Sequence, residues 1–272
     1  MDTIIEDTAI SVISQPFDGT KLYLNSYSII DSVPLLEVIK KVCYTKRDVR
    51  AGWIGPGIPF THSSAFQAIA RWALQHWAMY SGFIPMVNRN GGRIIDVGCG
   101  MGYATVCLAS ILANYTITGI DVDELCIKFS NLFNRKYKER VVYIQDDFMS
   151  FNQYCKYDYI FALEILEHIP AALHYSFVDK CLSLLSYDGL LFVTTPNALD
   201  GKDGKYSHIG LLNRNRVRAF LGRYERQIVR ASFYDNRKLD SMDEGKFIIN
   251  DPIDTFEDTN KNKSHFRFVM RR

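Results

Sequence analysis

The feature that most constrains this 272-residue chain is an alternation of short apolar runs and helix-like segments that begins near residue 93. Apolar runs that read as strands occupy residues 93–97, 116–121, 141–146, 157–163 and 189–195, and segments with helical spacing follow from Tyr103 and over 124–138 and 171–185. Strands that alternate with helices of this length form a parallel sheet covered on both faces. Right-handed crossovers then predict a doubly wound α/β domain with ligands at the carboxyl ends of its strands.

The two ends of the chain are less regular. The composition of residues 196–208 predicts a loop, and Asn213 is placed to cap a helix that runs to Leu221. Two further strands are predicted over residues 226–234 and 264–272. The acidic stretch between them, residues 235–260, is predicted to be a long excursion from the domain. Upstream lie a Gly/Pro loop, GWIGPGIPF, and a helix over residues 63–80. One side of this helix carries an apolar stripe that is either core or the wall of a lid: Phe66, Ile69, Ala73, Trp77 and Tyr80. We predict a mainly helical extension and substrate lid over residues 1–90, and a ligand-binding domain over 91–272.

Charge and cysteine content limit the kinds of partner and the cellular location that are expected for this protein. The formal charge is only +2, but residues 202–230 carry eight Lys/Arg against two acidic residues, and residues 235–258 carry eight acidic residues against three basic ones. These segments are two solvated faces, or the first is a basic surface for an anionic substrate such as a nucleotide-linked sugar or an RNA backbone. Six scattered cysteines without a CxxC pair, an acidic start and no apolar run near the ~18 residues of a membrane helix predict a soluble, cytoplasmic protein.

The glycine-rich turn in IIDVGCGMG, residues 94–102, follows a predicted strand and opens a predicted helix. There the backbone of a turn can approach a ligand at a helix N-terminus. A dinucleotide fingerprint needs GxGxxG, but Gly98, Gly100 and Gly102 form GxGxG. With Asp96 just before it, the turn resembles motif I of the class I S-adenosylmethionine-dependent methyltransferases. The resemblance implies a Rossmann-like seven-stranded sheet, S-adenosylmethionine as cofactor and methyl transfer as the activity.

Further matches to this family fall at the ends of later strands, over roughly residues 90–235. Asp121 ends the second predicted strand, where a carboxylate accepts hydrogen bonds from ribose hydroxyls of either S-adenosylmethionine or NAD. Asp147 matches the acidic residue that the family places at the adenine amino group, with Asp146 as the alternative and Phe148 beside the ring. The cofactor site implied by the resemblance consists of Asp96, Gly98, Cys99, Gly100, Gly102, Asp121, Val122, Asp146, Asp147, Phe148 and Leu163.

The segment LEILEH, residues 163–168, is the second candidate for chemistry. At helical spacing, Glu164, Glu167 and His168 lie on one face and converge. The ExxEH pattern resembles the ubiquinone-biosynthesis O-methyltransferases and the small-RNA 3′-terminal 2′-O-methyltransferases. That resemblance implies a divalent ion, Mg²⁺ or Mn²⁺, held by Glu164, Glu167, His168 and the later His208. The chain departs from the RNA enzymes because Tyr206-Ser207-His208 lacks their HxH spacing.

The alternatives to a metal site stay open at this point. Without a metal, His168 or His208 serves as general base, and the candidate catalytic residues are His168, His208 and Glu164. In the structural alternative, the acidic residue only stabilises a helix N-terminus.

The acceptor expected from the sequence is a hydroxyl of a sugar, a sugar nucleotide or another small polyhydroxylated metabolite. The aromatic loop with Trp53, Phe60 and His62 would close over it. An RNA 2′-O-methyltransferase and a non-catalytic S-adenosylmethionine-binding partner subunit are the alternatives. No membrane partner is expected, and a homo-oligomer is compatible with the sequence.

Overall fold

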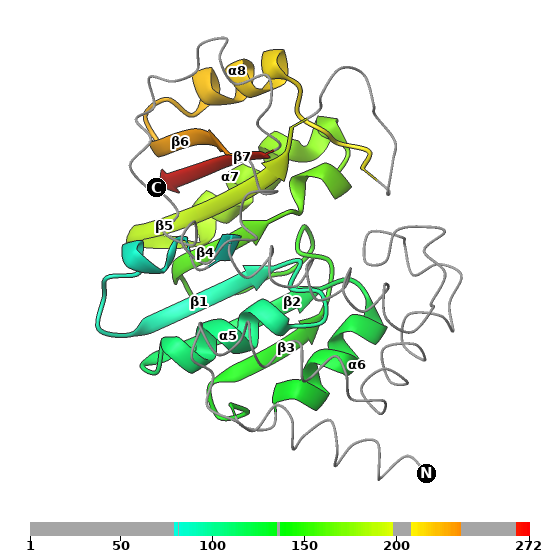
Figure 1. The fold of residues 1–272 in the computed structure, drawn as a ribbon, viewed down its shortest axis with the longest axis vertical. Helices are drawn as coiled ribbons and strands as arrows, with labels where there is room; N and C mark the ends of the chain where they lie inside the picture. The colour runs from blue at the N-terminus through cyan, green and yellow to red at the C-terminus, as the bar shows by residue number, and fades with distance from the viewer. Residues whose placement is uncertain (1–78, 81, 135–136, 198–207, 235–264) are drawn as a thin grey trace.

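The computed structural model describes residues 79–80, 82–134, 137–197, 208–234 and 265–272, which form one sheet with helices on both faces (Figure 1). The aromatic loop, most of the helix predicted over 63–80, most of the loop at 196–208 and nearly all of the acidic excursion lie outside these residues. The boundary at residues 90 and 91 stays a prediction. In the described part of the chain, no helix has the length and apolar character needed to cross a bilayer.

The sheet has seven strands in the order β3-β2-β1-β4-β5-β7-β6. The first five in this order are mutually parallel, and β7 runs antiparallel between β5 and β6. The strands are β1 (Gly92–Val97), β2 (Tyr115–Asp121), β3 (Val141–Gln145), β4 (Tyr157–Leu163), β5 (Leu185–Pro196), β6 (Ile228–Tyr234) and β7 (His265–Arg271). The predicted doubly wound, mostly parallel seven-stranded sheet is confirmed.

The connecting helices are α5 (Tyr103–Ile111), α6 (Glu124–Phe133), α7 (His174–Leu184) and α8 (Arg214–Arg223), with 3₁₀ turns η1 (Ile84–Met86), η3 (Leu166–His168) and η4 (Ala171–Leu173). The predicted cap of α8 is confirmed, because the Asn213 side chain accepts a hydrogen bond from the Arg216 amide. The helix predicted over 124–138 was too long. It ends at Phe133, where the Asn134 side chain donates to the Val141 carbonyl and the chain turns toward β3.

Two other boundaries differ from the sequence prediction. The helix predicted from residue 171 begins as the 3₁₀ turn η4, because Pro170 in front of it is extended. Strand β5 starts at Leu185 rather than at residue 189, since Leu185 pairs with Tyr157 before a register shift. This irregularity lies at the amino end of the strand and leaves its carboxyl end as predicted.

Side chains alternate between the two faces of the sheet and build two apolar clusters. On one face, Tyr159 and Phe161 of β4 pack with α5 and with residues 79–80 and 83–84. On the other face, Ile160 of β4 packs with α7 and α8. Figure 1 shows α5 on the near side of the sheet and α7 on the far side. With both faces covered, only the edges formed by the strand ends are left for a ligand.

One buried carboxylate joins the segment before β1 to the sheet. Tyr80 stacks on Phe161 with ring centroids 5.5 Å apart, and its hydroxyl donates to Asp96 Oδ1 at 2.7 Å. The Thr105 hydroxyl of α5 donates to the other oxygen. Burial raises the pKa of Asp96 to about 6, and these two donors oppose the rise. Tyr80, predicted as core or as a lid wall, is therefore core and also anchors the strand that leads into the glycine turn.

Removal of the Tyr80 hydroxyl should destabilise the fold in a pH-dependent way. In Tyr80→Phe the ionised Asp96 loses one of two donors, so we expect the free energy of unfolding at pH 8 to fall by about 1–3 kcal/mol. The pKa of Asp96 already lies above its ordinary value of 3.8, so the native state binds the extra proton and stability falls as pH rises through about 4 to 6. The variant raises that pKa further. Its loss of unfolding free energy relative to the wild type should therefore be smaller at pH 5, where Asp96 is mostly protonated.

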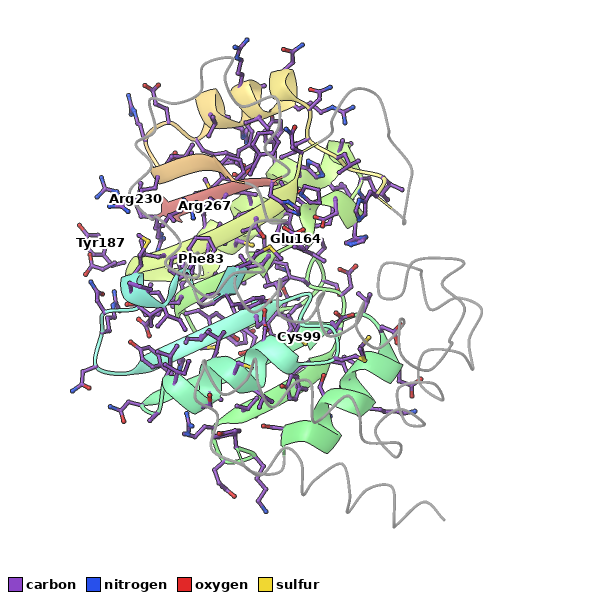
Figure 2. All side chains as sticks on the ribbon, viewed as in Figure 1. Phe83, Cys99, Glu164, Tyr187, Arg230 and Arg267 are labelled. Carbon is purple, nitrogen blue, oxygen red and sulfur yellow. The ribbon has the colours of Figure 1, made fainter. Side chains whose placement is uncertain are left out.

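Urea denaturation at pH 5 and pH 8 measures this difference. Tyr187→Phe is the matched control, because Tyr187 is 87% exposed and lies at the opposite edge of the sheet from Glu164 (Figure 2). An equal deficit at both pH values would show that the Asp96 charge does not depend on Tyr80.

Candidate active site

The turn after β1 has a left-handed backbone at every second residue. Gly98, Gly100 and Gly102 have φ of 70°, 54° and 74°, and Gly102 is the N-cap residue of α5. The amides of Gly98 and Cys99 both donate to the Ile120 carbonyl, at 2.8 and 3.1 Å, so the turn is tied to the end of β2. A Cβ on Gly102 would lie 2.5 Å from the Tyr143 hydroxyl oxygen. The turn therefore depends on glycine both for its conformation and for its close packing.

The predicted ribose ligand, Asp121, faces this turn. Its Oδ2 accepts from the Gly100 amide and its Oδ1 from the Asp123 amide, both at 2.9 Å. Burial raises the pKa of Asp121, and the amide donors oppose the rise. A carboxylate oxygen has two lone pairs, so each retains acceptor capacity, and the neighbouring Val122 is 58% exposed. Asp121 and Val122 thus present a polar and an apolar surface side by side, which suits a nucleoside.

The segment after β3 supplies two carboxylates, but its aromatic side chain is buried. The Asp146 amide donates to the Asp121 carbonyl at 3.0 Å, and Asp147 is exposed, with Oδ1 accepting from the Met149 amide at 2.9 Å. Phe148, expected beside an adenine ring, is only 6% exposed and packs against Phe177 of α7. Its ring is part of the core, because the turn after β3 directs it inward.

Three other predicted cofactor residues lie beneath the surface. Asp96, Cys99 and Leu163 are 0%, 7% and 4% exposed. They support the turn and the end of β4. Of the predicted cofactor residues, Gly98, Asp121, Val122, Asp146 and Asp147 are at least partly exposed, whereas Gly100 and Gly102 are buried.

Glu164 follows β4 with an unusual backbone conformation. Its φ is 55°, and among the described residues it is the one non-glycine residue in the left-handed region. The helical spacing predicted for this segment was therefore wrong, because the chain turns at Glu164 and then forms the short 3₁₀ turn η3. Glu167 and His168 still lie close together, but Glu164 is not part of their group. The Glu164 carboxylate instead accepts from the Thr194 hydroxyl at 2.7 Å and lies 3.1 Å from His265 Nε2.

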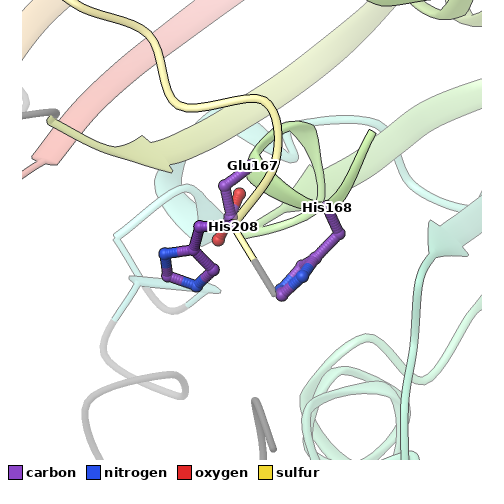
Figure 3. Close-up of side chains that lie close together, drawn as sticks. All are labelled: Glu167, His168 and His208. Atoms are coloured by element: carbon purple, nitrogen blue, oxygen red, sulfur yellow. The ribbon is translucent and has the colours of Figure 1, made fainter. Parts of the chain in front are cut away.

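Glu167 and His168 of η3 do come together with His208, which lies on a separate segment (Figure 3). One oxygen or nitrogen from each lies within 4.8 Å of the others. The two imidazole rings have centroids 5.1 Å apart and are nearly perpendicular, at 78°. The Gly210 amide donates to the Glu167 carbonyl at 3.0 Å, which holds the segment after His208 against η3. We call these three residues the Glu-His-His cluster.

Burial sets the electrostatics of this cluster. Glu167 is 1% exposed, and burial raises its pKa well above the ordinary value, with the Glu164 charge adding to the rise. The Thr195 hydroxyl donates to Glu167 at 3.3 Å and opposes it. Partial burial and His168 lower the pKa of His208. A neutral imidazole accepts a proton or binds a cation, so the cluster suits either chemistry.

His265 is the site residue that the sequence analysis missed. It starts β7, which is antiparallel to β5, and it pairs with Pro196 at the carboxyl end of β5. The first residue of an antiparallel strand therefore lies at the same edge as the ends of β4 and β5. The alternating run at 264–272 predicted the strand, but not its neighbours.

Comparison with known proteins agrees with this geometry. Residues 67–246 match the family model described as "Methyltransferase domain". The ubiquinone biosynthesis O-methyltransferase of Glaesserella parasuis serovar 5 (strain SH0165) is 36% identical over 118 residues, which are 39% of this chain and 46% of that protein. The chain thus spans just under half the length of this relative.

Solved structures show a shared fold at low identity. Magnesium protoporphyrin IX methyltransferase from Synechocystis PCC 6803, with bound S-adenosylmethionine, matches with a TM-score of 0.52 and 14% identity, covering 92% of this chain and 97% of that one. The [4+2]-cyclase SpnF matches with a TM-score of 0.53 and 16% identity, covering 76% and 83%. The chain belongs to the methyltransferase domain family and has the Rossmann-like fold of the class I S-adenosylmethionine-dependent methyltransferases.

Proposed function

We propose that this protein is an S-adenosylmethionine-dependent O-methyltransferase that methylates one hydroxyl of a small polyhydroxylated acceptor, such as a sugar or a sugar nucleotide. The observation that carries the proposal is the Glu-His-His cluster at the carboxyl edge of the sheet that also holds the glycine turn and Asp121. A relative at 36% identity is an O-methyltransferase by name, which supports a hydroxyl acceptor.

The residues of the turn fit S-adenosylmethionine better than a dinucleotide. The left-handed glycines hold the turn at the N-terminus of α5 against Asp121, which keeps acceptor capacity for ribose hydroxyls. Asp146 and Asp147 lie beyond the next strand and would meet the adenine amino group. When bound, the sulfonium of this cofactor supplies an electrophilic methyl group. The chain has to bind and orient it.

The acceptor hydroxyl has to lose its proton as its oxygen attacks in line with the C–S bond. An imidazole within reach of that oxygen takes the proton. His208 suits this role, because its lowered pKa keeps the ring neutral near pH 7. His168 lies beside it and is the second candidate base.

A divalent ion at the Glu-His-His cluster is the alternative to an imidazole base, because a histidine nitrogen that ligates the ion cannot also take the proton. One carboxylate and two imidazoles form a donor set that Mn²⁺ accepts, and Mg²⁺ accepts it if water completes the shell. Such an ion would lower the pKa of a bound hydroxyl. Of the four ligands expected from the sequence, Glu167, His168 and His208 remain, while Glu164 lies with Thr194 and His265.

The exposed arginines after the cluster support an anionic acceptor. Helix α8, the turn after it and strand β6 follow His208 and carry the exposed side chains of Arg216, Arg218, Arg226 and Arg230. Guanidinium groups bind phosphate, so a sugar nucleotide suits this surface. An RNA backbone would use the same arginines, and its binding would depend steeply on salt.

The acceptor class is tested by formation of S-adenosylhomocysteine with three hydroxyl compounds: UDP-glucose, a catechol and a short RNA with a free 3′-terminal ribose. We expect turnover with UDP-glucose and a weak dependence on salt. Turnover of RNA alone, with KM rising steeply between 50 and 200 mM salt as is typical of phosphate contacts, would replace the sugar acceptor by RNA. Cofactor binding without turnover of any compound would support a non-catalytic partner subunit instead.

Loss of the Asp121 charge should weaken cofactor binding. In Asp121→Asn, one carboxylate acceptor becomes an amide donor facing the Gly100 or Asp123 amide, and the ribose loses a charged acceptor. We expect the dissociation constant of S-adenosylmethionine to rise about tenfold or more, from the loss of one charge-assisted hydrogen bond. Isothermal titration measures it, with Asp188→Asn as control because the Asp188 side chain is 78% exposed. Unchanged affinity in Asp121→Asn would remove Asp121 from the cofactor site.

Glu167→Gln tests the metal. The substitution keeps the size of the side chain but removes the anionic ligand, so we expect the heat of Mn²⁺ binding to metal-stripped protein to disappear. Glu139→Gln, at an exposed glutamate, should bind Mn²⁺ as the wild type does. A wild type that shows no heat with Mn²⁺ or Mg²⁺, and full turnover in EDTA, would leave His168 and His208 as metal-free bases.

A further inference from the structure

We propose that His265 is a positioning residue for methyl transfer. Together with Thr194, it holds the Glu164 carboxylate in one orientation between the cofactor turn and the Glu-His-His cluster, where Glu164 directs the acceptor hydroxyl. This inference rests on the proposed function, because it gives Glu164 a task in the same site. It adds a residue from β7, which lies 101 positions away in the sequence.

The backbone of Glu164 indicates that its placement is specified. A non-glycine residue in the left-handed region is strained, and such residues cluster at ligand sites. Two hydrogen bonds with Thr194 stabilise this conformation. The Glu164 amide donates to the Thr194 carbonyl at 3.0 Å, and the side chain returns to the Thr194 hydroxyl at 2.7 Å.

His265 supplies the other partner of the carboxylate. Its Nε2 lies 3.1 Å from Glu164 Oε2, and both side chains are 10% exposed. An ionised carboxylate is an acceptor only, so Nε2 is the donor in this contact. Each oxygen of Glu164 therefore has a named donor from a different strand, β5 for Thr194 and β7 for His265. The carboxylate cannot rotate without breaking one of these contacts.

The clamped carboxylate lies between the two parts of the site. Glu164 follows β4, which lies in the sheet between β1, where the glycine turn begins, and β5, where the Thr195 hydroxyl contacts Glu167. The Glu164 charge contributes to the raised pKa of Tyr80, whose hydroxyl donates to Asp96. The same charge contributes to the raised pKa of Glu167 and opposes the lowered pKa of His208. A carboxylate near both parts is placed to accept a hydrogen bond from an acceptor that bridges them.

The contact itself is tested first, without any assay of activity. In protein labelled with ¹⁵N-histidine, the long-range ¹H–¹⁵N spectrum resolves each imidazole, and His265→Gln identifies the signals of His265. We expect Glu164→Gln to shift these signals, and Glu225→Gln, at an exposed glutamate, to leave them unchanged. Signals of His265 that do not respond to Glu164→Gln would overturn the clamp.

A double-mutant cycle tests whether His265 acts through Glu164, with UDP-glucose as acceptor, or with the catechol or RNA if the wild type methylates that compound instead. His265→Leu removes the donor and should lower kcat about ten- to a hundredfold, as expected for a hydrogen bond to a charged group. His265→Gln keeps an N–H donor and should recover part of the rate. In the Glu164→Gln background, His265→Leu should lower kcat by no more than about twofold.

Controls separate positioning from folding. The dissociation constant of S-adenosylmethionine should stay unchanged in His265→Leu, and Arg271→Ala, at the exposed far end of β7, should keep wild-type kcat. The same loss of kcat with and without Glu164→Gln would overturn the inference. If His265→Leu does not fold, Thr194→Val takes its place in the cycle, and His265→Gln still reports on the histidine.

The two proposals fail in different ways. If the wild type methylates none of the three acceptors, the proposed function fails and the positioning role falls with it, while the spectrum still decides whether the Glu164–His265 contact exists. If the wild type is active but the cycle is additive, only the role of His265 is lost.

Discussion

The glycine turn after β1 is the constraint on which the rest of the site depends. Its backbone is left-handed at Gly98, Gly100 and Gly102, and it is tied to the end of β2 through the Ile120 carbonyl and the Asp121 carboxylate. Asp96, just before the turn, is itself held by hydrogen bonds from the Tyr80 and Thr105 hydroxyls. The surface formed by this turn thus depends on buried polar contacts. A substitution that removes one of these contacts should lower both the stability of the fold and the affinity for the cofactor.

The second part of the site exists because the parallel strands end at one edge and one antiparallel strand begins there. Strand β4 ends in Glu164 and η3, and β5 ends beside Thr194 and Thr195. Strand β7 adds His265 at the same edge. Since a cyclase shares this fold, the sheet alone does not define the reaction. The side chains at its edge carry the proposal for a hydroxyl acceptor.

The sequence predicted the parts of the structure that depend on local patterns. The apolar run of β4 has the predicted bounds, and the glycine turn and Asp121 face each other as expected. The end of α6 was wrong, because Asn134 makes a contact beyond the helix. Glu164 and His265 were out of reach for a different reason. The left-handed backbone of Glu164 and its partners are set by β5 and β7, and no spacing along the chain encodes that contact.

The central claim is that the edge of this sheet binds S-adenosylmethionine, as opposed to another adenine nucleotide. The most direct measurement is isothermal titration of the wild-type protein with S-adenosylmethionine, S-adenosylhomocysteine and NAD⁺ in parallel. The account predicts micromolar dissociation constants for the first two and no heat of binding for NAD⁺. Binding of NAD⁺ without binding of S-adenosylmethionine would contradict it, because the GxGxG turn and Asp121 would then serve a dinucleotide.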